Sequence, residues 1–488
     1  MSTITQEGLA VDEPRKLGLG TRLAYGFGSI AYGVKNNGFD YFLLLFYSQV
    51  VGLDARLVGI AITTALVFDA ISDPVVGYWS DNLRSRWGRR HPFMYASAIP
   101  VALSYFLLWN PPADLGESGL FWYLLVFAVC IRTFITAYET PSSALAPELT
   151  EDYEERSALF SFRYYFGWTG GNAMSVAMFV LIFPAFVTDT IADGRFNRDA
   201  YALYGIISSV LIFVSILVSA MGTHGHIQHM KTPPPQRQLT LGRIFAEIVE
   251  TLSNRSFIAL FIAAIFGAVA AGLSAALAFY IWTYFWGFSS EETGVITLGV
   301  FISAVIGTVL APAVTRRFGK KTGAMISGLA AFVGVPLPVV LRLLGVLPED
   351  ETFVFWFVFV STVLDVGLII CFQIQLSSMM ADLVEQSELQ TGRRSEGIFY
   401  SAVTFIRKSV QGFGILAASF VLYLAGLESG AAAADVSDET VWRLGAYYVP
   451  SVLGLYLAMM AVISFYRLDR TEHEENLRKL AVARAEAK

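Results

Sequence analysis

The sequence predicts an all-α membrane protein, with twelve transmembrane helices arranged as two six-helix bundles. Hydrophobic residues make up 55% of the chain and charged residues only 15%, against about 25% charged residues in soluble domains. The mean hydropathy of +0.56 agrees with this composition. The apolar residues are also grouped into long segments, and a helix needs about 20 of them to cross a bilayer.

Each of twelve apolar segments is interpreted as one span, with boundaries where apolar residues give way to polar ones. The first seventeen residues are polar and of mixed charge, so we expect no cleavable signal peptide. The predicted spans cover residues 23–50, 57–81, 93–110, 119–149, 158–186, 202–222, 257–288, 293–315, 322–346, 352–381, 397–427 and 446–466.

The distribution of lysine and arginine predicts the orientation, because positively charged loops stay on the cytoplasmic side. With the N-terminus inside, 24 of the 34 basic residues fall in inside segments and only five in outside loops. We therefore expect a multi-pass protein of the cell inner (plasma) membrane with both termini in the cytoplasm. The net charge of −6 does not bear on this rule.

An internal repeat divides the chain into two halves. The loop after the second span reads SRWGRR (Ser85–Arg90), and the loop after the eighth reads RRFGKK (Arg316–Lys321). The longest polar interior stretch separates the halves. The predicted parts are a cytoplasmic N-terminal tail (1–22), a six-helix bundle (23–222), a cytoplasmic central loop (223–256), a second six-helix bundle (257–466) and a cytoplasmic C-terminal tail (467–488).

Two carboxylates in the middle of the second span predict a cation site. Asp69 and Asp73 are four residues apart, so they share one face of a helix. Two buried negative charges are costly in a membrane unless something positive compensates them. Pro74 has no N–H, so the carbonyl of Ala70 is a spare oxygen ligand beside the pair. The alternative is a pair of aspartates that faces water at a helix end.

Other basic and acidic residues also fall within spans, where charges are functional candidates. Arg132 in the fourth span and Asp365 in the tenth occupy matching places in the two halves. One interpretation pairs them with each other, although the sequence alone does not place them.

Several separate blocks resemble one family of transporters. The runs are LAYGFGS, SQVVGL, DAISDPVVGYWSD, RSRWGRRHPF and ADLVEQSELQTGRRSEGIFYS. They resemble the glycoside, pentoside and hexuronide cation symporters of the major facilitator superfamily, the family of the melibiose permease. The match runs from the first span to the eleventh, and it implies the major facilitator fold with a site at the bilayer midplane.

The resemblance implies a cation between Asp69 and Asp73, which would ligate a metal only if the coupling ion is Na⁺. The family's amide ligand is replaced by Ser72, which is shorter and favours a proton over sodium. The hydroxyl ligand of the fourth span matches Thr136.

The resemblance also implies sugar contacts, with two departures. A family acid of the first span is missing, and the nearest charge is Lys35. A family tryptophan of the tenth span is replaced by Gln373. We infer a substrate other than a simple galactoside, and the balance of charges would tolerate an anionic sugar such as a hexuronide. The matching substrate contacts are Glu139, Arg163, Thr404 and Lys408, to which we add Lys35 and Gln373.

Two charged clusters at the predicted cytoplasmic ends are candidates for gating. One combines Asp81 with Arg86, Arg89 and Arg90, and the other contains Asp382 and Arg394. Such pairs could hold the cytoplasmic side shut. Equally, the arginines could fix topology and meet anionic lipid headgroups.

These observations predict a secondary active transporter that couples Na⁺ or H⁺ to uptake of a glycoside, pentoside or hexuronide by alternating access. We expect a monomer whose partners are the sugar and the lipid bilayer, with no other cofactor and no nucleic acid. A lipid or lysolipid transporter of the same fold is one alternative. A membrane-embedded enzyme or receptor is another, disfavoured because the sequence has no HExxH, GxSxG or phosphate-loop motif.

Overall fold

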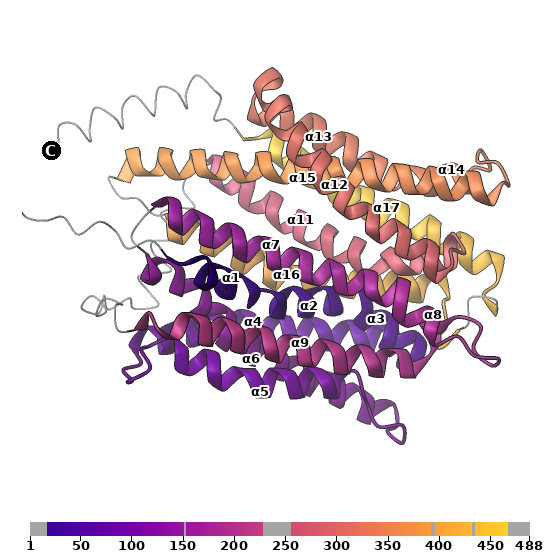
Figure 1. Ribbon diagram of the computed structural model, residues 1–488. Coiled ribbons are helices and arrows are strands. Elements are labelled where there is room, and N and C mark those ends of the chain that lie inside the picture. Colours follow the sequence, from indigo (N-terminus) through magenta and orange to yellow (C-terminus); the bar gives the residue numbers. More distant parts are fainter. Residues whose placement is uncertain (1–16, 151–152, 228–254, 392–395, 432–434, 467–488) are drawn as a thin grey trace, which may run out of the picture.

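The described part of the computed structural model is helical and contains no strand (Figure 1). It covers residues 17–150, 153–227, 255–391, 396–431 and 435–466. Within it, ten helices are long and apolar enough to cross a membrane. The first span and α16 (Glu396–Ala425) add two further helical passes, so the arrangement is consistent with the twelve predicted spans.

The first span is helical from Leu19 to Val50, but it is not one regular α-helix. It breaks at Gly28 and Ser29 and contains two π-helical turns, which occur mostly at functional sites. Its elements are α1 (Leu19–Phe27), α2 (Ile30–Asn37), η1 (Gly38–Phe42), α3 (Leu43–Leu45) and η2 (Phe46–Val50).

The rest of the first half follows the predicted order of spans. A π-helical turn also lies near the end of the fifth span, and a short 3₁₀ turn follows in the next loop. The elements are α4 (Ala55–Asn82), α5 (His91–Leu108), α6 (Glu117–Leu149), α7 (Tyr153–Ala177), η3 (Met178–Ile182), α8 (Phe183–Ala185), η4 (Gly194–Phe196) and α9 (Arg198–His224).

The second half repeats this pattern, with α12 packed on α15 as α4 is on α6, and α13 on α15 as α5 is on α6. Helix α15 continues ten residues past the predicted end of its span. That extension is polar but free of glycine and proline, so hydropathy marks only the apolar part of the helix. The elements are α11 (Arg255–Tyr280), η6 (Ile281–Phe285), α12 (Ser290–Phe318), α13 (Lys320–Gly334), α14 (Leu337–Leu343), α15 (Glu351–Thr391), α16 and α17 (Asp438–Ser464).

The two groups of helices run roughly parallel and meet along a seam. Helix α4 packs on α16, α11 on η1, and α12 on η3 and α7. In the seam, the Thr63 hydroxyl donates a hydrogen bond to the carbonyl of Gly412 at 2.8 Å. Figure 1 shows α4, α5, α6 and α9 on one side and α12 to α15 on the other.

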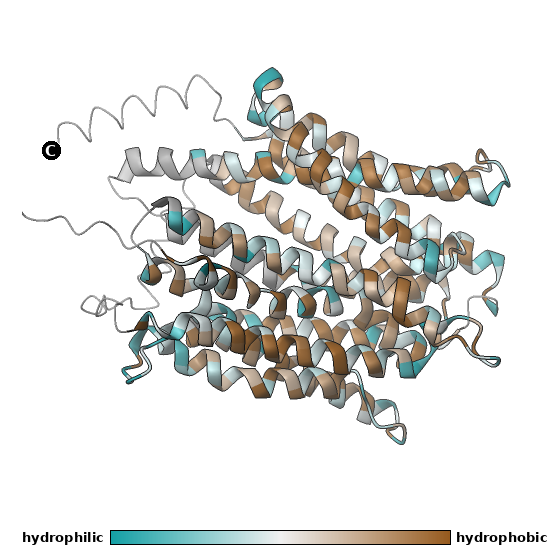
Figure 2. Ribbon diagram, viewed as in Figure 1, coloured by the Kyte–Doolittle hydropathy of each residue, from teal (hydrophilic) through white to brown (hydrophobic). Residues whose placement is uncertain are grey.

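Polar residues concentrate at the two ends of the molecule, and apolar residues fill the middle (Figure 2). Large apolar side chains such as Leu103, Val126 and Val305 are exposed on the helix surfaces, as expected where a helix contacts lipid. We call the end with the loop 83–90 the basic end. The opposite end, which carries the loop 186–197, is called the Arg195 end.

Close packing of α2 against α7 depends on Gly33. A Cβ atom at this position would lie 1.9 Å from the carbonyl oxygen of Gly167, and a backbone atom cannot rotate away. We expect Gly33→Ala to lower the free energy of unfolding by about 1–3 kcal/mol through overpacking. The thermal midpoint of purified protein would show this loss. Gly20→Ala is the control, because nothing lies within 4 Å of its Cβ position; equal midpoints for the two variants would contradict the prediction.

Candidate functional site

The two carboxylates of the second span lie together between α4 and α6. Asp69 is buried, with 2% of its surface exposed, and Asp73 is partly buried one helical turn later. The Thr136 hydroxyl on α6 lies 2.8 Å from Oδ1 of Asp69 and 2.9 Å from Oδ1 of Asp73. The structure therefore places these three predicted site residues side by side.

The Thr136 bridge limits how the two carboxylates can be charged. A hydroxyl carries one hydrogen, so Thr136 donates to only one carboxylate at a time. The Thr136 oxygen then also lies close to an oxygen of the other carboxylate, with no hydroxyl hydrogen between them. That contact needs a proton on the carboxyl group or a cation between the two oxygens. The arrangement is thus chemically able to hold one small positive ion.

Arg132, which the sequence marked only as a charge within a span, belongs to the same site. Its Nη1 lies 3.2 Å from Oδ2 of Asp69, in a fully buried ion pair, and its guanidinium group stacks over Phe39 at 4.8 Å. The interpretation that Arg132 pairs with Asp365 is therefore wrong. Arg132 is on the face of α6 that packs on α4, whereas Asp365 is on α15 in the other bundle.

Ser72 lies beside the pair, and its hydroxyl donates to the carbonyl of Asp69 at 3.0 Å. The hydrogen is thus used within its own helix. A serine in this position has no second polar atom, whereas the family's amide has both a carbonyl and an amino group.

Two of the predicted sugar contacts meet between α6 and α7. The buried Arg163 donates to the Ser142 hydroxyl at 2.9 Å and to the carbonyl of Glu139 at 3.3 Å. Its guanidinium group also lies 5.1 Å from the ring centre of Tyr32 on α2 and 6.0 Å from that of Tyr25 on α1. Three spans of the first half thus hold the guanidinium group of Arg163 in place beside Glu139.

The remaining predicted substrate contacts are not all brought to this place. Lys35 is buried on α2, with 3% exposed. Gln373 on α15 is exposed. Thr404 and Lys408 fall on α16, but their side chains lie outside the described residues.

The ion pairs at the basic end tie helix ends together within each half. Arg90 pairs with Asp81 at 2.5 Å and with Glu148 of α6 at 3.0 Å, and Arg89 pairs with Glu148 at 2.7 Å. In the second half, Lys320 pairs with Asp382 of α15 at 2.6 Å.

In the first half, the ion pairs join the loop after the second span to the end of the fourth span, α6. In the second half, they join the loop after the eighth span to the tenth span, α15. The two partners that sequence reasoning missed are Glu148 and Lys320. Arg86 is exposed beside Trp87, and Arg394 lies outside the described residues.

The two halves are joined at the opposite end by Arg195, which the sequence marked only as an outside arginine. Its side chain is 4% exposed and pairs with Asp193 at 2.6 Å. It reaches into the second half, where it donates to the Thr283 hydroxyl at 2.9 Å and to the carbonyl of Phe288 at 2.7 Å.

Other hydrogen bonds at the Arg195 end also cross between the halves. Ser48 of η2 lies 2.5 Å from the Tyr280 hydroxyl, and Tyr284 donates to Gln49 at 3.1 Å. The backbone N–H of Gly430 donates to the carbonyl of Ser48 at 3.0 Å. The Arg195 end is therefore closed by contacts between the bundles.

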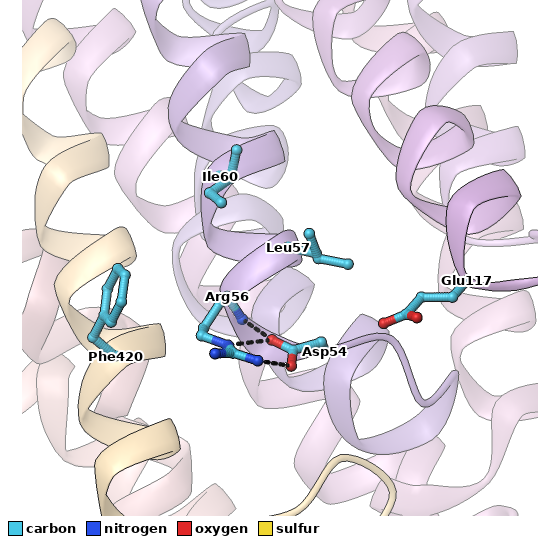
Figure 3. A pocket seen from close by; sticks show the side chains of 6 residues that line it. All are labelled: Asp54, Arg56, Leu57, Ile60, Glu117 and Phe420. Carbon is cyan, nitrogen blue, oxygen red and sulfur yellow. Dashed lines mark hydrogen bonds and ion pairs between the residues drawn. The ribbon is translucent and has the colours of Figure 1, made fainter.

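A shallow pocket of about 360 Å³ lies outside this closure, between the starts of α4 and α6 and the face of α16 (Figure 3). Asp54 caps α4 and receives hydrogen bonds from the backbone and side chain of Arg56. Those side-chain hydrogen bonds lower the pKa of Asp54, against an opposing effect of burial. None of the predicted site residues lines this pocket.

Residues 24–470 match the family described as MFS/sugar transport protein. A Synechocystis protein named an uncharacterized symporter is 25% identical and covers 94% of this chain and 96% of its own. The sodium-dependent lysophosphatidylcholine symporter 1-A of Danio rerio is 23% identical, over 96% of this chain and 89% of its own. The isoprimeverose transporter of Lactiplantibacillus pentosus is 23% identical, over 92% and 89%.

The fold matches that of a bacterial homologue of the iron transporter ferroportin. The TM-score is 0.62 at 14% identity, over 92% of this chain and 99% of that one. The predicted fold class and the predicted resemblance are thus both confirmed, and the relatives are transporters rather than enzymes. The chain belongs to the MFS/sugar transport protein family of membrane transporters.

Proposed function

We propose that this protein is a symporter in which one monovalent cation at Asp69 and Asp73 drives uptake of a small glycoside. The observation that carries the proposal is the Thr136 hydroxyl within hydrogen-bond distance of both carboxylates. With Arg132 paired to Asp69, the four side chains carry two negative charges and one positive charge when all are ionised.

The charges of the first half support the uptake of a single positive ion. Its described spans carry three basic and four acidic residues away from their ends, which leaves one negative charge when all are ionised. One bound Na⁺ or H⁺ brings the sum to zero and lowers the cost of enclosing the site in the membrane. The residues are Lys35, Arg132, Arg163, Asp40, Asp69, Asp73 and Glu139.

The number of ligands and the names of the relatives point to different ions. Sodium needs several oxygen atoms, whereas a proton needs only a carboxylate and an acceptor. The Thr136 bridge and the short Ser72 side chain favour H⁺, and the name of the zebrafish relative favours Na⁺.

The substrate site adjoins the cation site on α6. Glu139 lies less than one turn of helix beyond Thr136, and Arg163 binds the carbonyl of Glu139. A carboxylate, and a guanidinium group that lies over aromatic rings, suit the hydroxyl groups and the apolar face of a sugar. The cation and the sugar would each raise the affinity for the other by the same factor.

In the proposed cycle the two halves rock around this site. The ion pairs at the basic end keep each half rigid, while the contacts at the Arg195 end break and reform. We assign the basic end to the cytoplasm by the positive-inside rule, in the inner (plasma) membrane.

A lysolipid is the second candidate substrate, since the lysophosphatidylcholine symporter covers nearly the whole chain and Gln373 replaces an aromatic sugar contact. The test is uptake into energised vesicles with glycosides, pentosides, uronides and lysophosphatidylcholine, under gradients of Na⁺, Li⁺ or H⁺ alone. We expect gradient-driven uptake of a glycoside-type sugar under one of these gradients. Uptake of lysophosphatidylcholine alone would replace the sugar assignment, and uptake independent of every cation gradient would overturn symport.

A further inference from the structure

One buried acid takes no part in the site of the first half. Asp365 lies on α15 with 9% of its surface exposed. At 1.5 Å per residue it is about 21 Å from the start of α15, well inside a hydrocarbon core about 30 Å thick. A carboxylate at such depth must be paired or neutralised.

Asp365 faces a break in the ninth span. A Cβ atom on Gly334 would lie only 2.1 Å from Oδ1 of Asp365. Helix α13 ends at Gly334, and α14 begins three residues later at Leu337. Pro336 and Pro338 have no N–H, so the carbonyls of Phe332 and Gly334 lack their helical donors. The acid thus lies beside backbone oxygens that are able to accept a hydrogen bond.

No basic side chain of the described residues forms an ion pair with Asp365. Helices α12, α13, α14 and α17 carry charges only towards their ends, and the buried Tyr448 of α17 lies close enough to interact with Asp365. Arg342 of α14 stacks instead on Phe285 and Trp286. The charged residues of these helices are Glu291, Glu292, Arg316, Arg317, Lys320, Lys321, Arg342, Asp438, Glu439 and Arg443.

We infer that Asp365 is a second proton-binding site, in the other half from Asp69 and Asp73. The carboxylate takes a proton from hydronium and becomes a neutral carboxylic acid, with water as the other product. In that form the acid has an O–H donor, and the helix break supplies the acceptor. The neutral acid also avoids the cost of an unpaired buried charge.

Dicyclohexylcarbodiimide tests this assignment, because it modifies carboxyl groups that are protonated in apolar surroundings. Full-length protein is labelled at several pH values and the modified peptide is identified by mass spectrometry. We expect label on Asp365 that declines as the pH rises, because the deprotonated carboxylate does not react. Asp365→Asn should remove it and Asp73→Asn should keep it. Absence of label, or label that does not change with pH, would overturn the proposal. Protection by Na⁺ at constant pH would also overturn it, since the site would then bind a metal cation.

Thermal unfolding gives an independent readout. A carboxyl group that holds its proton in the folded state gives stability at low pH that is lost as the pH rises. The amide of Asp365→Asn stays neutral, so the wild-type midpoint should fall by several degrees relative to this variant between about pH 5 and pH 8. Asp114→Asn, in an exposed loop, should follow the wild type. Parallel profiles of wild type and Asp365→Asn would refute proton binding.

Discussion

Asp73→Asn is expected to abolish accumulation of substrate against its gradient, while the protein still reaches the membrane. The amide has neither the negative charge nor the proton affinity of the carboxylate, so the cation has nothing to neutralise. Downhill exchange of substrate should continue, because the sugar contacts on α6 and α7 are unchanged. Uptake in energised vesicles measures both activities.

The choice of Asp73 rather than Asp69 matters for this test. Asp69→Asn would also leave the buried Arg132 without its partner, which is worth about 3–5 kcal/mol of stability. The Asp73→Asn change leaves the Arg132–Asp69 ion pair in place. Asp114→Asn is the matched control for the chemical change. If Asp73→Asn concentrated substrate as well as this control does, the cation site would be wrongly assigned.

Arg195→Ala is expected to shift the protein from the conformation that is closed at the Arg195 end towards one that is open at this end. The substitution removes buried, charged hydrogen bonds between the halves, each such group being worth about 2–5 kcal/mol at an interface. Ser48 is fully buried within this closure, where it contacts Tyr280. In a background without Cys130 and Cys371, a membrane-impermeant maleimide should label Ser48→Cys at least about tenfold faster when Arg195 is replaced.

Arg198→Ala provides the control for that experiment. Arg198 lies in the same connection, but it donates to the carbonyl of Pro111 within its own half. Its removal should leave the labelling rate unchanged. Equal rates for the Arg195 and Arg198 variants would show that the Arg195 contacts do not hold the halves together.

Hydropathy predicted the spans closely, because burial in lipid imposes one simple requirement on every helix. The least regular span is the first, where Gly28 and the π-helical turns interrupt the helix. Hydropathy records none of these features, since they depend on backbone packing such as that of Gly33 on Gly167. Helix α15 exceeded its prediction for the opposite reason, since its last turns are helical without being apolar.

The candidate site was predictable where its residues share a helix or match the family's motif. Asp69 and Asp73 were identified from their spacing, and Thr136 from the family resemblance. Arg132 was visible as a buried charge, but its partner lies 63 residues away in sequence, and nothing in the spacing selects Asp69 over Asp365. Arg195 gave no signal, because an arginine in a connecting loop is ordinarily exposed. Its role depends on acceptors about 90 residues further along the chain.

The cation response of the purified protein tests the central claim most directly, since it requires no substrate. The measurement is the thermal midpoint as a function of Na⁺ at constant ionic strength, and of pH without Na⁺, in the wild type and in Asp73→Asn. The account predicts that Asp73→Asn loses the stabilisation by Na⁺. When H⁺ is the coupling ion, Asp73→Asn instead loses a part of the stabilisation by low pH. That part is the one that remains in Asp365→Asn. A variant with the full wild-type response to both ions would contradict a cation site at Asp69 and Asp73.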